Sequence, residues 1–260
     1  MTESVRRNGG RILRARTMLT TTTGIALAAM MAGCATTQQV TVDHRRLQAS
    51  CAFLGNAVCS QLTPSAAPGR FSSEAISGGG DPVATLRYIN PRASWTKYKQ
   101  VLIAPVTFWG DDINVSPKDQ HALADYFYQV LQRQMGKKFK IVQTPTPGAI
   151  TIQVALIDAQ HATPGLRTIS MVVPQARALG TLKYLATGTY AFVGGATAEV
   201  KIMDSVSHQV LAAAVDRRVG GGSLQTAAQW EWGDAENAMN AWAEQLTNRL
   251  SSWTSGNAQP

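Results

Sequence analysis

The segment Asp204-Ser205-Val206-Ser207-His208 contains all three residue types of a Ser-His-Asp catalytic triad. In a triad these side chains meet in a chain of hydrogen bonds of about 2.6–3.2 Å. Close neighbours in a tight turn cannot fold back on one another in this way, and the chain has no Gly-x-Ser-x-Gly nucleophile elbow. We therefore interpret the segment as a turn and predict that the protein is not an enzyme. An envelope hydrolase is the least favoured function.

The histidines and glycines show no pattern typical of metal or nucleotide binding. No His-x-x-x-His or His-Glu pair occurs among the histidines, which are His44, His121, His161 and His208. Gly136-Lys137 lacks the glycine that a phosphate-binding loop requires five residues earlier. We therefore expect no metal and no cofactor.

Cys51 and Cys59 enclose a short loop that an oxidising compartment could close as a disulfide. Closing such a loop contributes roughly 2–3 kcal/mol of chain-entropy stabilisation. Two free thiols are the second interpretation. A structural metal site needs four ligands, and only His44 lies nearby in the sequence, so metal binding has the weakest support.

Cys34 stands where a secretory signal peptide would be cleaved. Arginines precede an apolar stretch over residues 24–33, which ends in Ala32-Gly33. The Ala32-Gly33-Cys34 ending resembles the lipobox of bacterial lipoproteins, in which the cysteine thiol receives a diacylglycerol and the new amino group is acylated. Several acyl chains give lasting membrane anchoring. Because Ala35 rather than Asp follows, we expect the periplasmic leaflet of the outer membrane.

Removing residues 1–33 also removes half of the net charge. This segment has five arginines and one acid, whereas the remaining chain has 19 basic and 15 acidic residues. That mild excess and the exported location argue against nucleic-acid binding. No apolar run reaches the ~18 residues of a transmembrane helix.

Several segments have the periodicity of regular elements. Residues 101–108 form an apolar run typical of a buried strand, with Pro105 expected at a strand end or bulge. A helix is predicted after Ser116 as N-cap, with Pro117 in its first turn and Gly136 at its end. A second helix is predicted over residues 234–251 from apolar residues spaced three and four apart.

Two strand pairs complete the predicted fold. Residues 139–143 and 150–159 are one hairpin candidate, and residues 196–204 and 210–219 are the other. The order favours an α/β (α+β) sandwich, with a mixed or antiparallel sheet and two main helices packed on it. The predicted division is a signal peptide (1–33), a lipidated tether and extended arm with one short strand at 86–89 (34–94), the sandwich domain (95–253) and a disordered tail (254–260).

Three segments of the domain resemble one known family. They are Trp95-x-x-Tyr98-x-x-Val101-Leu102-Ile103-Ala104-Pro105-Val106-x-x-Trp109, then Gly195-Ala196-x-Ala198-Glu199-Val200-x-Ile202-x-Asp204-Ser205, and Leu211-Ala212-Ala213-Ala214-Val215-Asp216-Arg217-Arg218. The family is the domain of unknown function 3313 of Gram-negative lipoproteins, and the resemblance covers residues 52–250. It implies a fold and a location but no activity. His208 departs from the glycine usual in that hairpin, and it is costly if the turn needs positive φ.

Asp216-Arg217-Arg218 ends an apolar strand. Alternation places Asp216 and Arg218 on one face and Arg217 on the other. We expect an ion pair here or a tie to Glu236 or Glu244 of the last helix, with partner binding by Arg217 as the alternative.

Trp230 and Trp232 precede the last helix and are candidate exposed anchors for a partner. Residues 164–194 form an apolar insertion without acids, with Leu179, Leu182 and Leu185 on one face of a candidate helix. This insertion could cover the core, lie on a membrane or contact a partner.

The sequence favours an outer-membrane lipoprotein with a non-catalytic binding or assembly domain in the periplasm. Its partner would be another envelope protein or a second copy of the chain. The alternative is a carrier or secretion-associated lipoprotein that holds an apolar or polymeric ligand.

Overall fold

The structure is a computed structural model. It describes residues 37–40, 42, 51–64, 86–109, 115–160, 162, 194–220 and 232–257. All of these residues belong to one compact unit, Cys34–Pro260. The signal segment and Cys34 lie outside the described residues, so lipidation stays a prediction.

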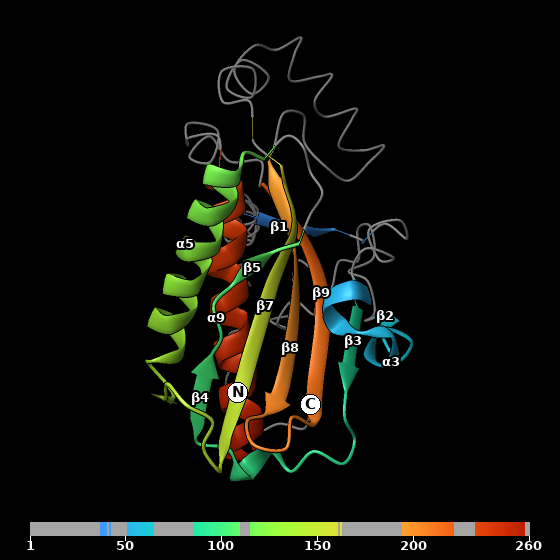
Figure 1. The fold of residues 1–260 in the computed structure, drawn as a ribbon, viewed down its shortest axis with the longest axis vertical. Helices are drawn as coiled ribbons and strands as arrows, with labels where there is room; N and C mark the ends of the chain where they lie inside the picture. The colour runs from blue at the N-terminus through green and yellow to red at the C-terminus, as the bar shows by residue number, and fades with distance from the viewer. Residues whose placement is uncertain are drawn as a thin grey trace, which may run out of the picture. The chain divides into compact units, whose positions relative to one another are not determined.

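Three long antiparallel strands form the centre of a mixed sheet (Figure 1). They are β7 (Ala149–Gln160), β8 (Gly195–Asp204) and β9 (Val210–Gly220). Beyond β9 lie β3 (Leu86–Ile89) and β2 (Thr63–Pro64), and β1 (Thr37–Val40) also pairs with β9. This mixed sheet confirms the predicted fold class.

The parallel part of the sheet lies on the other side of β7. β4 (Gln100–Ile103) and β5 (Thr107–Phe108) both pair with β7 in parallel, and Pro105 lies in the break between them as expected. β6 (Lys140–Ile141) pairs in parallel with β4. The predicted hairpin of residues 139–143 with 150–159 is therefore wrong, because β4 separates β6 from β7.

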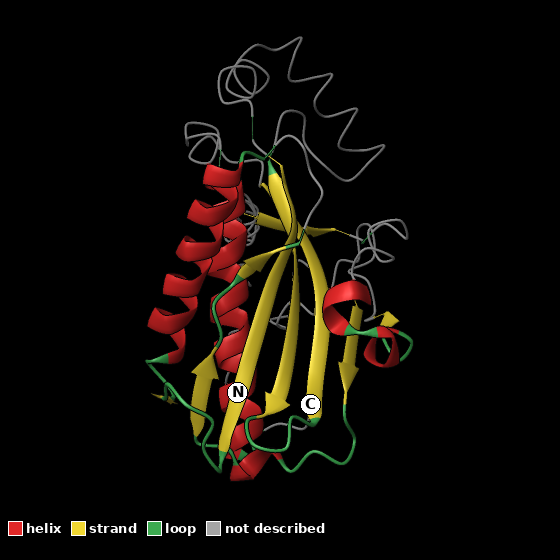
Figure 2. Cartoon of the chain, viewed as in Figure 1, coloured by secondary structure: helices red, strands yellow, loops and turns green. Residues whose placement is uncertain are grey.

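Two long helices lie side by side on one face of the sheet (Figure 2). α5 (Pro117–Met135) begins at the predicted cap, where the Ser116 side chain accepts a hydrogen bond from the Asp119 amide at 3.2 Å. α9 (Gly233–Ser255) is longer than predicted and includes Thr254 and Ser255, which had been assigned to the tail. A short 3-10 helix, η1 (Trp95–Lys97), leads into β4.

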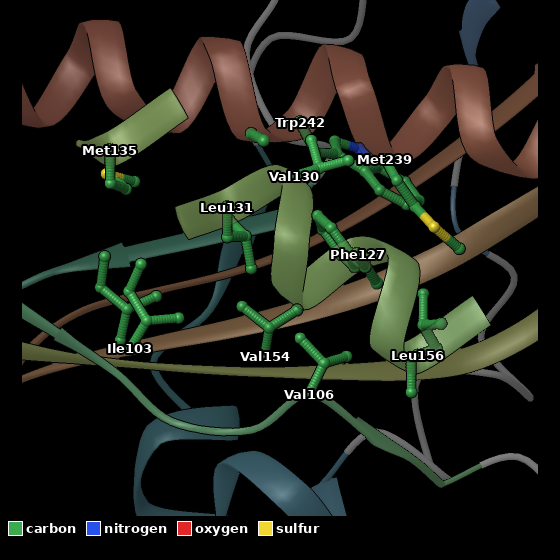
Figure 3. Packing of buried hydrophobic residues seen from close by; sticks show 14 of the residues in the cluster. Ile103, Val106, Phe127, Val130, Leu131, Met135, Val154, Leu156, Met239 and Trp242 are labelled. Carbon is green, nitrogen blue, oxygen red and sulfur yellow. The ribbon is translucent and has the colours of Figure 1, made fainter. Parts of the chain in front are cut away.

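The main core fills the space between this helical layer and the sheet (Figure 3). Phe127, Val130 and Leu131 of α5 face Val154 and Leu156 of β7, and all five side chains are buried. Trp242 and Met239 bring α9 into the same cluster. The apolar faces that the sequence predicted for both helices are therefore confirmed.

The opposite face of the sheet is covered in part by residues 51–64. A disulfide joins Cys51 to Cys59. Cys51 begins the helical residues 51–54, and Cys59 ends α3 (Asn56–Cys59). Leu54 and Val58 pack on Ala213 and Val215 of β9. The structure thus has the predicted disulfide and not two free thiols.

The start of the domain differs from the prediction. Strands β1, β2 and β3 belong to the sheet, so residues 37–40, 63–64 and 86–89 are part of the domain, which begins before the predicted boundary at residue 95. Only residues 86–89 had the sequence pattern of a strand. β2 has only two residues, and the largely polar sequence of β1 has no apolar pattern. None of the helices in the described ranges is long and apolar enough to cross a bilayer.

Candidate functional site

A pocket of about 100 Å³ lies under α9, on the helical face of strands β3, β9 and β8. Its floor contains three alanines, Ala198, Ala212 and Ala214. They share one face because Ala198 of β8 pairs with Asp216 of β9, while Ala212 and Ala214 alternate with Asp216 along β9. These short side chains leave space that larger residues would fill.

Apolar side chains of the helices form the roof of the pocket. Trp242, Leu246 and Trp253 come from α9, and Phe127 comes from α5. The rings of Phe127 and Trp242 lie 5.9 Å apart between centroids. The pocket is therefore apolar above and below, as in many binding sites for apolar groups.

One wall of the pocket is polar and centres on the buried carboxylate of Asp216. It accepts hydrogen bonds from Trp242 Nε1 at 2.7 Å and from Gln39 Nε2 of β1 at 2.5 Å. Arg218 Nε lies 3.3 Å from the same carboxylate. A buried charge needs such complete pairing, because removing it from water costs several kcal/mol.

Arg218 extends this network to two further elements. Its Nη2 donates to Gln245 Oε1 of α9 at 3.0 Å, and its Nη1 donates to Thr37 Oγ1 of β1 at 3.2 Å. Because a guanidinium only donates, the Gln245 atom facing it must be the oxygen. Gln245 Nε2, on an amide that lines the pocket, is buried and has no hydrogen-bond partner among the described residues. A bound group with an acceptor atom could accept a hydrogen bond from this N–H.

Cationic side chains also reach the pocket. Arg87 of β3 and Arg249 of α9 line it. An apolar group attached to a polar or anionic chain therefore matches the lining better than an apolar molecule alone.

Arg217 points to the opposite face, as alternation predicted. Its Nη1 lies 3.1 Å from Asp158 Oδ2, and its Nη2 donates to Gln160 at 3.2 Å. Both side chains of the ion pair are largely buried, with 13% and 12% exposed. Of the two expected arrangements, the ion pair is present, and its acid is Asp158 of β7.

On this opposite face, Lys201 of β8 contacts residues 51–64, the segment that contains the disulfide. Its Nζ donates to the carbonyl oxygen of Phe53 at 3.0 Å and lies 5.1 Å from the centre of that ring. Burial lowers the pKa of Lys201, and the neighbouring charge of Glu199 acts in the other direction. This arrangement explains the lysine as a structural contact.

Trp232 is not an exposed anchor, because only 2% of its surface is accessible where it precedes α9. Its side chain packs in the core instead. Trp230, Leu179, Leu182 and Leu185 lie outside the described residues, so their partner-binding role stays a prediction.

Residues 204–208 form the predicted turn. Asp204 Oδ1 accepts from the amides of Val206 and Ser207 at 3.1 and 3.0 Å. His208 is exposed and has a φ of 57°, the positive value that its departure from glycine makes costly. These contacts use the Asp204 carboxylate to build the turn. The ranges that the structure covers also contain no group of three metal-ligating side chains.

The pocket itself was missed by sequence reasoning. Trp242 lies on the apolar stripe of the last predicted helix, which indicates only a core position, and no sequence pattern marks Gln245. The available signal was the run Ala212-Ala213-Ala214 in a strand, because alanine is depleted in strands and leaves room beneath a facing helix.

Three solved structures show remote similarity. PelC from Paraburkholderia phytofirmans, solved as a dodecamer, is 9% identical with a TM-score of 0.34, over 62% of this chain and 94% of that one. A DUF330 protein from Xanthomonas campestris is 13% identical with a TM-score of 0.35, over 66% and 94%. A DUF4136 protein from Bacteroides thetaiotaomicron is 10% identical with a TM-score of 0.34, over 65% and 95%. At these values none of them supports an inference about this chain.

No curated protein matches the chain significantly. The sequence profile of the protein family of unknown function DUF3313 matches residues 74–246, which include strands β3 to β9, α5 and most of α9. This match confirms the resemblance found in the sequence. The chain belongs to the DUF3313 family.

Proposed function

We propose that the chain is an outer-membrane lipoprotein, anchored through Cys34, whose periplasmic domain binds another envelope protein without catalysing a reaction. The observation that carries the binding role is the pocket under α9, with its alanine floor and aromatic roof. The proposed anchor rests on the signal-like residues 1–33 and the cysteine that follows them.

The size of the pocket supports a protein partner over a carried lipid. Sites for drug-sized ligands have volumes of ~300–1,000 Å³, whereas this pocket holds about 100 Å³. Such a volume suits one bulky apolar side chain. The unpartnered N–H of Gln245 would then bind a carbonyl oxygen of the partner's backbone.

The test is in-cell crosslinking of the lipidated protein, followed by purification and mass spectrometry. Ala214→Leu fills the pocket from its floor and should remove the crosslinked partner while the protein stays folded. Ala57→Leu, on the exposed surface of α3, is the matched control and should keep the partner. A partner that crosslinks equally to the Ala214→Leu protein would contradict the proposal. Purification with bound lipid and no partner would favour the carrier alternative.

Residues 164–194 are proposed as a second contact with the same partner, on the basis of their apolar, acid-free sequence. Leu182→Asp should then weaken crosslinking without unfolding the domain. Unchanged crosslinking in this variant would limit the contact to the pocket.

A further inference from the structure

We propose that the end of the domain opposite the start of β1 is a cationic surface that binds the carboxylate-bearing polymer of the cell wall. We define this distal end as the edge where β4, β6 and β7 begin and where β8 ends. Six exposed cationic residues lie in the segments that meet there: Arg92, Lys97, Lys99, Lys137, Lys138 and Lys140.

Contacts between elements show that these segments meet. Lys140 of β6 is the register partner of Gln100, next to Lys99. Lys99 Nζ donates to the carbonyl oxygen of Thr254 near the end of α9 at 2.9 Å. Lys97 Nζ lies 3.2 Å from Asp204 at the end of β8. The starts of β4 and β7 and the end of β8 lie at one end of the sheet (Figure 1). The contacts above therefore bring cations from separate parts of the chain to this end.

The distal end has little negative charge to neutralise them. Asp204 is the single acid in residues 90–100, 136–149, 204–210 and 251–257. Its carboxylate is already bonded to Lys97, to Tyr98 and to two backbone amides. Within the described part of the chain, Arg92, Lys138 and Lys140 form no ion pair. The position of Lys137 and Lys138 after α5 suits the helix dipole, but this does not explain the cations on the other elements.

The start of β1 determines which way this surface points. Thr37 pairs with Gly220 at the end of β9, opposite the distal end. Cys34 precedes Thr37 by three residues, which span ~10 Å when extended. α9 has 23 residues and runs from this β1 end to the distal end, a length of ~34 Å. A lipid on Cys34 would thus hold the β1 end at the membrane and direct the distal end away from it.

This direction, which rests on the proposed anchoring at Cys34, selects the partner. Two copies anchored by such short segments in one membrane cannot place the distal end of one against the β1 end of the other. The cell wall lies on the periplasmic side of the outer membrane and carries repeated carboxylates. Lysine and arginine side chains spread over an edge suit a repeating polyanion, because their attraction does not need a single fixed geometry.

The test uses the full-length purified protein in detergent, mixed with insoluble purified cell wall and sedimented. We expect the wild-type protein to sediment with the cell wall at 150 mM salt, and retention to fall as salt rises because the screening length shortens. Lys138→Glu should reduce the apparent affinity roughly fivefold. Lys118→Glu has the same change in charge on the exposed start of α5, at the other end, and should retain wild-type affinity. Circular dichroism and thermal melting check that both variants are folded.

Several outcomes would overturn the proposal. They are no retention of the wild-type protein, equal loss with Lys118→Glu, unchanged retention after the cell-wall carboxylates are amidated, or retention by phosphatidylglycerol vesicles but not by cell wall. Sedimentation requires neither the lipid nor the pocket. Failure here would therefore leave the proposed anchoring and pocket standing, and these are tested by the membrane fraction of Cys34→Ala and by crosslinking.

Discussion

At the scale of single residues, the charge of Arg218 is balanced by one buried partner. Replacing Arg218 with Met keeps much of the volume but removes the cation that lies 3.3 Å from the buried Asp216 carboxylate. Breaking a buried pair from one side costs ~3–5 kcal/mol. We expect Arg218→Met to lower the free energy of unfolding by about this amount in chemical denaturation. Arg92→Met, on the exposed surface, should change it by less than ~0.5 kcal/mol. Equal effects of the two variants would show that the pair contributes nothing.

Asp204 gives the protein a residue-level dependence on pH. The Ser207 amide, followed by the Tyr98 hydroxyl, the Val206 amide and Lys97, holds the pKa of this carboxyl well below its usual range. The unfolded chain has a pKa of ~3.9 at this group. Its stabilising contribution is therefore complete above about pH 4 and is lost as pH falls toward the folded-state pKa.

We accordingly expect the wild-type protein to lose stability below about pH 4, and Asp204→Asn to lose less over the same interval. Urea denaturation between pH 2.5 and pH 7 measures both curves. Parallel curves for the two proteins would argue that Asp204 has the same proton affinity in both states.

At the scale of elements, the junction of β8, β9 and α9 depends on one close approach. Asp234 of α9 is buried, and its Oδ2 accepts from the amide of Gly194 at 2.8 Å. A methyl group on Gly220 would collide with the same carboxylate. Gly220→Ala should therefore destabilise the protein by ~1–3 kcal/mol in thermal unfolding.

A double-mutant cycle distinguishes this collision from a local backbone effect. Asp234→Ala removes the obstructing carboxylate, so the double variant should be less destabilised than the sum of the single variants. Simple additivity would mean that the two residues do not interact.

The disulfide makes the segment over residues 51–64 a stable part of the sheet cover. Its two cysteines are eight positions apart, a loop whose closure contributes ~2–3 kcal/mol. The double variant Cys51→Ser, Cys59→Ser should lose about that much stability. Intact-mass analysis should find that neither cysteine of the wild-type protein can be alkylated without reductant. Two alkylated thiols would exclude the bridge.

The elements also show what the sequence could and could not predict. α5 was predicted with its cap because Ser116, Pro117 and Asp119 act locally. β1 has four residues and gains its strand conformation from pairing with β9, so no local pattern marks it. The position of β6 beside β4 is likewise a non-local contact. The pocket was missed for a related reason: alanines on β8 and β9 leave space only when α9 lies above them.

At the scale of the whole molecule, the short segment before β1 predicts a fixed orientation at the membrane. A fluorophore on Lys118→Cys should transfer energy to a headgroup dye more efficiently than one on Lys138→Cys, because α9 separates the two ends by ~34 Å. Cys51 and Cys59 are bridged and Cys34 would be acylated, so each new thiol is labelled selectively.

Inserting a flexible segment of about 20 residues after Thr36 supplies the control, because a chain of that length spans ~25 Å on average. The difference between the two labels should then largely disappear. Equal transfer in the original protein would contradict a fixed orientation.

The network around Asp216 has a mechanical consequence. β1 is bonded through Gln39 and Thr37 to Asp216 and Arg218, which in turn hold Trp242 and Gln245 beside the pocket. Tension applied at Cys34 would run along β1, which pairs antiparallel with β9, so the hydrogen bonds between these strands would share the load. The same path ends at the pocket wall. Tension on the lipid anchor would therefore act on the residues that contact the partner. The affinity for that partner would then depend on the applied force.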